Sequence, residues 1–414
     1  MSEAKTLKKI EHDMELGSEQ QRIDAVLDAF DYGDAGLYLI VQALNDPCQL
    51  VREAAHLLLT ENQSERAKQA LWDYLPYRHL QPLCTLHFLP DYEHYNYWLS
   101  YGKREKQPQK TPAAYRCWQT LDYVAFTPDE RTLITYTDRE MRTYLWNYRT
   151  GELQVELTVA SWEDGGHIVL SPNGSYVISN NQRVLEGYHL QRGDFVLDGY
   201  RLKCEPTALA IKSEYTLIAG GWGVTSYGIE PIYVYQLPIT DRAFNETWAE
   251  PNLIHYLRGH TSRVQSLLLS PDEALLLSQA HDRQNDSHHL WDTQTWELLR
   301  TYETSSEWIA DCLATRPNGQ VLASGDRAST ASVWDLRTDE VLYVLPGKAP
   351  TVMSVDGRVL ICRGELGGLL VWDLATNREI CTLANDIHEI EPLALSRDRQ
   401  FLVVRVEDTI QVWA

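Results

Sequence analysis

The residues best suited to bind a metal or exchange protons are concentrated between His281 and His289, a segment with three histidines and two aspartates. Imidazole and carboxylate groups are ligands that Zn²⁺ prefers. His288 and His289 are adjacent in an apolar strand pattern, so their side chains should point to opposite faces. We therefore expect no metal site here, and the sequence indicates no cofactor.

The chain lacks the short motifs of the common catalytic sites. It contains no phosphate-binding loop, no Gly-x-Ser-x-Gly and no His-Glu-x-x-His. The run Gly-Gly-Trp-Gly at 220–223 has no strand–turn–helix context, and an exposed loop explains it better than a dinucleotide site. We expect no catalytic residues and no enzymatic activity.

Composition narrows the possible partners. The 414 residues carry a net charge of −21, most of it after residue 112, so the body disfavours direct duplex binding. The seven cysteines are scattered, and the segment from Met1 to Glu15 has no apolar core of a secretory signal. We expect reduced thiols, a cytoplasmic location and no membrane segment.

A repeat dominates the chain after about residue 113. Seven short apolar segments end in an aromatic residue, at intervals of roughly 40 to 55 residues, which is the period of a four-stranded propeller blade. The aromatic positions are Trp146, Tyr188, Tyr235, Trp291, Trp334, Trp372 and Trp413.

Turn signals follow the same period. Each blade should contain one tight antiparallel hairpin, because Pro, Gly, Asn and Asp favour the turn conformations. The turns are expected at 127–129, 171–174, 212–214, 270–272, 316–319, 355–357 and 396–398.

These residues resemble the WD-repeat β-propeller family. The segment with Gly259-His260, Ser278, Asp282 and Trp291-Asp292 is closest to the family pattern. The resemblance implies that His260, Ser278, Asp282 and Trp291 form a hydrogen-bonded structural tetrad in blade four. The other blades depart from the pattern and should depend on apolar packing. We expect the segment Tyr115–Thr120 to close the ring by pairing with the last strand.

Helical periodicity replaces this pattern between residues 18 and 75. The segment 44–55, with Asp46-Pro47 and Val51-Arg52, resembles a HEAT repeat, and Asp46 is expected either to accept from the next helix or to bind Arg52. About two hairpins are few for a solenoid, so this domain should dock on the propeller or on a partner.

The expected architecture is mainly β: a seven-bladed β-propeller at 113–414 with a small HEAT-like helical domain at 1–75. The resemblance implies a bacterial type of this family. Residues 76–112 are expected to form an aromatic strap and linker, either packing between the two parts or offering a partner site. Its basic end, Lys103 to Lys110, is expected either to contact an acidic partner or, as is more common for such a run, to form a solvated loop.

One loop position could bind partners. Arg139, Arg283 and Arg327 each follow an aspartate before a third strand, and Trp222 and Tyr227 lie in the equivalent loop of blade three. The resemblance places these loops on the top face, near the channel. The arginines could bind an acidic segment of a protein, or each could pair with neighbouring acids. Blades six and seven offer Arg363 and Arg405 nearby.

The function predicted from these features is a non-enzymatic cytosolic scaffold that binds other proteins through the propeller top face and the helical domain. Two alternatives stay open. One is a hydrolase-type enzyme that uses the axial funnel, and the other is an adaptor for a nucleic-acid-associated complex.

Overall fold

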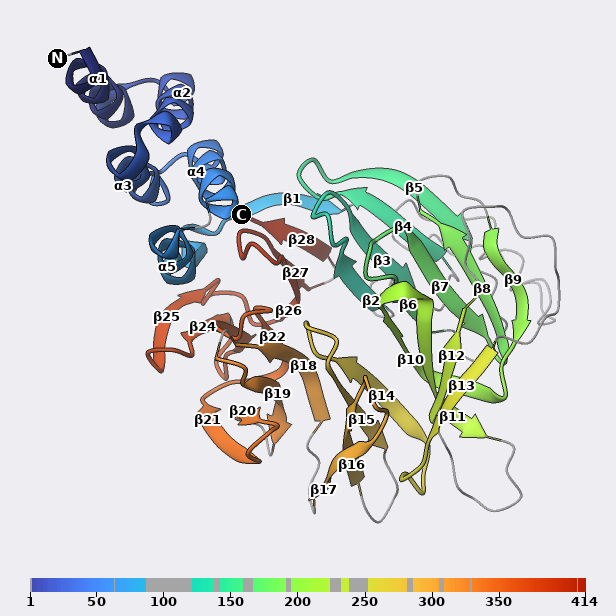
Figure 1. Ribbon diagram of the computed structural model, residues 1–414. Helices are drawn as coiled ribbons and strands as arrows, with labels where there is room; N and C mark the ends of the chain where they lie inside the picture. Colours follow the sequence, from blue (N-terminus) through green and yellow to red (C-terminus); the bar gives the residue numbers. More distant parts are fainter. Residues whose placement is uncertain are drawn as a thin grey trace, which may run out of the picture. The chain divides into compact units, whose positions relative to one another are not determined.

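The structure is a computed structural model that describes residues 2–62, 64–86, 121–137, 142–158, 167–190, 195–223, 232–237, 252–280, 286–304, 309–316, 318–327, 330–407 and 409–414. The chain divides into two compact units, a helical one within Met1–Leu80 and a β one within Gln81–Trp413 (Figure 1). No helix in these ranges has the length and hydropathy needed to cross a membrane.

The helical unit packs successive helices around one apolar core, which includes Val26, Ile40, Val51 and Leu59. Its elements are α1 (Ser2–Leu16), α2 (Glu19–Ala29), η1 (Phe30–Tyr32), α3 (Gly33–Ala43), α4 (Gln49–Glu61), α5 (Glu65–Asp73) and η2 (Pro76–His79).

Local signals fix where these helices begin. Ser18 and Gln21 form a capping box at α2, in which each side chain bonds the other residue's backbone N–H. The Asp46 carboxylate accepts from the backbone N–H of Cys48, 2.7 Å away, just before α4. It also pairs with Arg22 at 3.0 Å.

Arg52 does not bind the Asp46 carboxylate. Its guanidinium donates to the backbone carbonyls of Asp46 and Pro47, both at 3.0 Å. Of the two roles expected for Asp46, the structure shows acceptance at the start of the next helix. The Asp-Pro turn is thus fixed from both sides, because Arg22 and Arg52 bind different atoms of it.

The β unit is a seven-bladed propeller, which confirms the expected fold class. Every blade is a four-stranded antiparallel sheet. Blade one comprises β2 (Leu121–Phe126), β3 (Leu133–Thr137), β4 (Arg142–Asn147) and β5 (Glu152–Thr158), and blade two comprises β6 (Ile168–Leu170), β7 (Tyr176–Asn181), β8 (Val184–His189) and β9 (Phe195–Arg201). Blade three comprises β10 (Cys204–Lys212), β11 (Thr216–Gly223), β12 (Ile232–Gln236) and β13 (Asn252–Leu257). Blade four comprises β14 (Val264–Leu269), β15 (Leu275–Ala280), β16 (Asp286–Asp292) and β17 (Leu298–Thr304).

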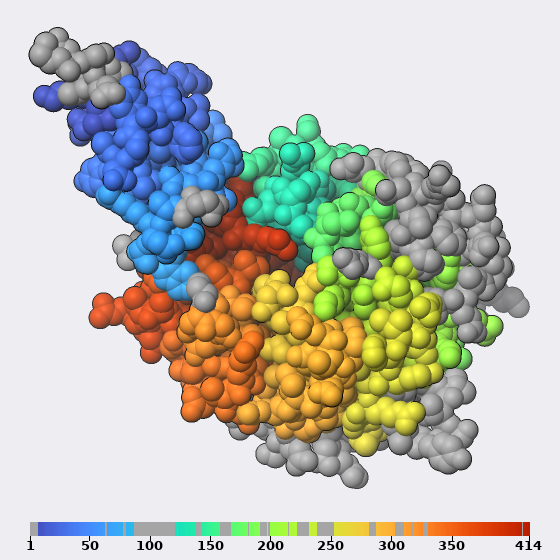
Figure 2. Space-filling view, in the orientation of Figure 1, coloured from blue at the N-terminus to red at the C-terminus, as the bar shows by residue number. Residues whose placement is uncertain are grey.

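The remaining blades follow in chain order, and the space-filling view shows the sequence of blades passing from green through yellow and orange to red (Figure 2). Blade five comprises β18 (Ile309–Thr315), β19 (Val321–Arg327), β20 (Thr330–Asp335) and β21 (Glu340–Leu345). Blade six comprises β22 (Lys348–Met353), β23 (Val359–Arg363), β24 (Leu369–Asp373) and β25 (Arg378–Leu383). Blade seven comprises β26 (Ile390–Leu395), β27 (Leu402–Val406), β28 (Thr409–Trp413) and β1 (Pro82–Leu86).

The aromatic repeat corresponds to the third strand of each blade. Trp146, Trp291 and Trp334, for example, lie at or next to the ends of β4, β16 and β20. Neighbouring blades bury their facing side chains in shared apolar clusters, such as the one that joins Trp291 of blade four to Ile218 of blade three. The roughly 40-residue period therefore reflects one blade that packs against the next.

Five of the seven hairpin turns between first and second strands share one recurring hydrogen bond. A Ser or Thr hydroxyl donates to the Asp or Asn side chain two residues later, over 2.5–2.7 Å. The pairs are Thr127–Asp129, Ser171–Asn173, Ser270–Asp272, Ser354–Asp356 and Ser396–Asp398. These positions coincide with or directly adjoin the turns predicted from sequence.

Blade seven is closed by a segment other than the one expected. β1 pairs antiparallel with β28, with Thr85 opposite Gln411 and Leu86 opposite Ile410. The prediction that residues 115–120 complete this blade was therefore wrong, and those residues lie outside the described ranges. The misleading signal was the aromatic content of 115–120. The true closing strand, Pro-Leu-Cys-Thr-Leu, is short and has no aromatic residue.

Truncating Leu86 should test this closure. Leu86 is 1% exposed, whereas Leu83 on the same strand is 39% exposed. We expect Leu86→Ala to lower the free energy of unfolding by about 2–5 kcal/mol, as buried leucine truncations do. The control Leu83→Ala should lower it by less than about 1 kcal/mol. Equal losses in denaturant unfolding followed by tryptophan fluorescence would argue against β1 as the closing strand.

Candidate partner-binding surfaces

One end of the propeller gathers the features that could bind a partner. In an antiparallel blade, the start of the first strand, the end of the second and the start of the third lie at the same end. We call this end the top face. Its described part is most continuous on blades six and seven, where residues 330–407 are unbroken.

Two arginines on this part of the top face share one carboxylate. Arg363, at the end of β23, donates to Glu391 over 3.3 Å. Arg405, on β27, donates to the same carboxylate from Nε over 3.0 Å. Glu391 lies on β26, so this cluster links blade six to blade seven. These two arginines pair with an acid, which was one of the two possibilities that the sequence left open.

A tight turn next to this cluster carries an exposed leucine. Leu366 is 88% exposed on the turn from Gly364 to Gly368. The turn is held by a bond from the Gly368 N–H to the Ile387 carbonyl, 2.8 Å long, and His388 Nδ1 lies 3.1 Å from the Leu366 carbonyl oxygen. Gly367 and Gly368 have φ of 108° and 70°, which glycine adopts without strain. A large apolar side chain is therefore presented on a fixed backbone.

The charge around Leu366 is acidic. Glu365, Asp386, Glu389 and Glu407 are all exposed in this sector. Together with Glu391, these acids outnumber Arg363 and Arg405, so the two arginines do not produce a cationic rim here. Leu366 is the exposed large apolar side chain that this described part of the top face presents to solvent.

Inside blade four, His260, Ser278 and Trp291 form one hydrogen-bonded network. His260 Nε2 lies 2.6 Å from the Ser278 hydroxyl, and the Trp291 indole donates to the same hydroxyl over 2.8 Å. The three residues are 0–2% exposed. Asp282, the fourth expected member, lies outside the described residues, and His260 Nδ1 lies 2.8 Å from the Ser287 hydroxyl.

A second histidine stacks on this network, and sequence reasoning did not anticipate it. The rings of His260 and His289 are 4.0 Å apart and nearly parallel, at 9°. A Cβ at Gly259 would lie only 2.4 Å from the His289 ring, so the Gly-His pair supplies the space for this stack. His289 Nδ1 is buried and has no hydrogen-bond partner in the described structure.

Both rings are held neutral by their surroundings. Burial, reinforced by His289 and His288, lowers the pKa of His260 to about 3. Burial and then His288 lower the pKa of His289 to about 4. Neutral imidazoles with these partners stabilise the blade, and neither ring reaches the surface. Within the described residues, no three His, Cys, Asp or Glu side chains are grouped to hold a metal ion.

Side-chain hydrogen bonds also connect the blades. The Gln279 amide of blade four bonds both the N–H and the carbonyl of Ala310 in blade five, at 3.0 and 3.1 Å. Thr351 of blade six bonds Asp311 and Ser324 of blade five at 2.8–2.9 Å. The sequence offered no periodic signal for these residues, because each link uses a different side chain.

Blade one retains part of the blade-four pattern. The Trp146 indole donates to the Thr135 hydroxyl over 2.9 Å, as Trp291 does to Ser278. Apolar packing is thus supplemented by a polar bond in this blade too. A Ser or Thr on the second strand opposite a Trp on the third was the available signal, and it was read only in blade four.

The predicted partner-binding residues fall mostly outside the described ranges. This holds for Arg139, Arg283 and Tyr227. Trp222 lies in β11 and Arg327 ends β19, so their backbones are placed at the top face. Trp222 and Arg327 keep their proposed role as predictions.

Comparisons with known proteins agree with this fold. Residues 251–284 and 296–335 match the family model described as "WD domain, G-beta repeat". Among solved structures, the chain is similar to "Kuenenia stuttgartiensis Hydrazine Synthase", with a TM-score of 0.53 and 12% sequence identity. That match covers 74% of this chain and 98% of the other chain, and at this identity it shows the fold alone. The family matches and the seven blades support a WD-repeat propeller.

Acid should destabilise the protein through the stacked histidines. In the unfolded chain the pKa of each ring is near 6.5, whereas in the folded protein the pKa is about 3 for His260 and about 4 for His289. The free energy of unfolding is therefore at its full value above pH 6.5. It falls as the pH is lowered toward 4, by about 2 kcal/mol per ring at pH 5, because the unfolded chain binds protons that the folded protein does not. His289→Phe should remove roughly half of this loss in unfolding measured across pH. Parallel pH profiles for the two proteins would contradict the assignment.

His260→Ala should weaken blade four at neutral pH. The change leaves the Ser278 and Ser287 hydroxyls without their ring partners, at a cost of about 1–3 kcal/mol each when the group stays buried. We expect a lower thermal midpoint that is the same with and without a chelator. A midpoint that depends on added Zn²⁺ would show instead that His260 binds a metal.

Proposed function

We propose that this protein is a non-catalytic cytosolic scaffold that binds other proteins through the propeller top face and through its HEAT-like helical domain. The observation that carries the proposal is Leu366. This side chain is 88% exposed, on a turn that backbone hydrogen bonds and His388 hold in place. Exposed apolar groups on preorganised backbone make effective contacts because little conformational freedom is lost on binding.

In this proposal the blades themselves have a structural role. Polar side chains such as Gln279 and Thr351 form hydrogen bonds from one blade to the next. The described cysteines are free thiols, which fits a reducing compartment. Two surfaces on one chain would bring separate partners close together and raise their effective concentration.

Leu366→Asp should reduce partner capture. In affinity purification with quantitative mass spectrometry from the native cell, we expect recovery of the bound proteins to fall at least about tenfold, as for a central apolar contact. The matched control is Val355→Asp, because Val355 is 38% exposed in the same blade but in a turn at the opposite end. Both variants should keep the native thermal midpoint.

A second variant tests the remainder of the top face. Changing Arg139, Arg283 and Arg327 together to Glu should lower capture of acidic partners in the same assay. Unaltered capture by both this variant and Leu366→Asp would reject the top face as the binding surface.

A further inference from the structure

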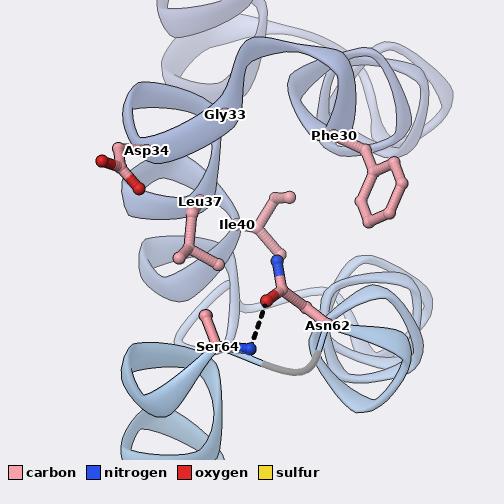
Figure 3. Close-up of a pocket in the computed structure, with 7 residues that line it drawn as sticks. All are labelled: Phe30, Gly33, Asp34, Leu37, Ile40, Asn62 and Ser64. Atoms are coloured by element: carbon pink, nitrogen blue, oxygen red, sulfur yellow. Dashed lines mark hydrogen bonds between the residues drawn. The ribbon is translucent and has the colours of Figure 1, made fainter.

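The helical unit contains a pocket between its helix hairpins that the packing of the chain leaves unfilled. It has a volume of about 160 Å³ and is lined by Phe30, Gly33, Asp34, Leu37, Ile40, Asn62 and Ser64 (Figure 3). These residues come from η1, α3 and the connection between α4 and α5. The volume suits one large amino-acid side chain and is far below that of a typical small-molecule site.

The pocket has an apolar floor and an exposed apolar wall. Leu37 and Ile40 form the floor and are 5% and 2% exposed. Phe30, on η1, forms the wall and is 44% exposed, and Leu27, near the end of the preceding helix α2, is 49% exposed. Neither side chain belongs to the buried core cluster of the unit. Apolar surface of this kind beside a cavity favours an apolar ligand.

The opposite side of the pocket offers a hydrogen-bond donor. Asn62 Oδ1 accepts from the backbone N–H of Ser64 over 2.9 Å, which fixes the orientation of the amide (Figure 3). Nδ2 therefore lies on the side of Ile40. An amide in this position can donate to a backbone carbonyl of an extended segment, while the floor receives that segment's side chain.

The rim of the pocket is negatively charged. Asp34 lines it, and Asp31 and Glu61 directly precede or follow lining residues, with all three exposed. Within the described residues these carboxylates form no ion pair. The nearby acid Glu65 differs, because it pairs with Lys68 at 2.8 Å. The nearest described cation, Arg66, lies over the Tyr38 ring, 5.7 Å from its centroid, and pairs with none of these acids, so a bound segment would meet net negative charge beside its apolar residue.

We propose that this pocket binds a segment of a partner protein in which one large apolar side chain is flanked by Lys or Arg. The apolar side chain enters between Phe30 and Leu37, and the basic residues lie against Asp34 and its neighbours. A second copy of this chain fits less well, because its net charge of −21 would oppose approach to an acidic rim. The proposal rests on the proposed function, since it specifies the partner of the helical domain.

The test uses random short peptides displayed on phage and selected on the full-length protein. We expect the enriched peptides to share a Leu, Ile, Met or Phe between basic residues, and to shift the methyl resonances of Leu37 and Ile40. Binding of these peptides, made synthetically, should weaken at least about tenfold in Phe30→Ala and in Asp34→Lys. It should also weaken as salt is added, because exposed charges are screened.

Matched variants on α1 test whether peptide binding depends on this pocket rather than on any exposed apolar or acidic side chain. Leu16 is 74% exposed and Glu11 is exposed, so Leu16→Ala and Glu11→Lys make the same kinds of change away from the pocket. Both should bind the peptides as the native protein does. All four variants should keep the native helical circular dichroism.

Three results would overturn the proposal: no enriched family, enriched peptides without the apolar–basic pattern, or equal binding by Phe30→Ala and Asp34→Lys. None of these would by itself reject the scaffold function, because partner capture through Leu366 is measured separately. Loss of peptide binding in the pocket variants with intact capture by the top face would show that the two surfaces act independently.

Discussion

The pairing of β1 with β28 is the contact on which the propeller depends. Every blade buries its two faces against neighbours, so the ring has stable surfaces only when the last blade meets the first. Blade seven obtains its fourth strand from residues before blade one, and the bonds between Thr85 and Gln411 and their neighbours cover an edge that would otherwise stay open. The same strand contacts blade one, where the Cys84 thiol donates to the Tyr148 carbonyl over 3.0 Å.

The sequence was sufficient for those parts of the fold that repeat. Seven aromatic positions and seven turns specify blades, since each repeat independently needs a buried third strand and a tight hairpin. The closing strand occurs once, so it had no periodic support, and its five residues resemble any short apolar segment. The sequence did not predict the inter-blade bonds of Gln279 and Thr351 either, because each bond depends on which residue faces the side chain across the interface.

The candidate surfaces likewise combine features that the sequence predicts with features that it does not. His260, Ser278 and Trp291 could be grouped through family resemblance, whereas the stacking of His289 depends on how closely Gly259 lets the two strands approach. Leu366 and the helical pocket had no sequence signature at all. A leucine is exposed only because a particular turn projects it, and a pocket exists only because side chains from three segments fail to meet. Predicting such features requires side-chain packing in three dimensions.

The separation along the chain of the two strands in blade seven has a consequence for biosynthesis. Loop-closure entropy grows only logarithmically with length, so joining β1 to β28 costs little more at equilibrium than joining nearer strands. Kinetically the situation differs, because β1 leaves the ribosome long before its partner has been translated. During that interval the growing chain carries an unclosed series of blades with exposed edges, the kind of intermediate that chaperones bind. The order of synthesis thus delays ring closure until β28 has emerged, and up to that point β1 has no partner strand.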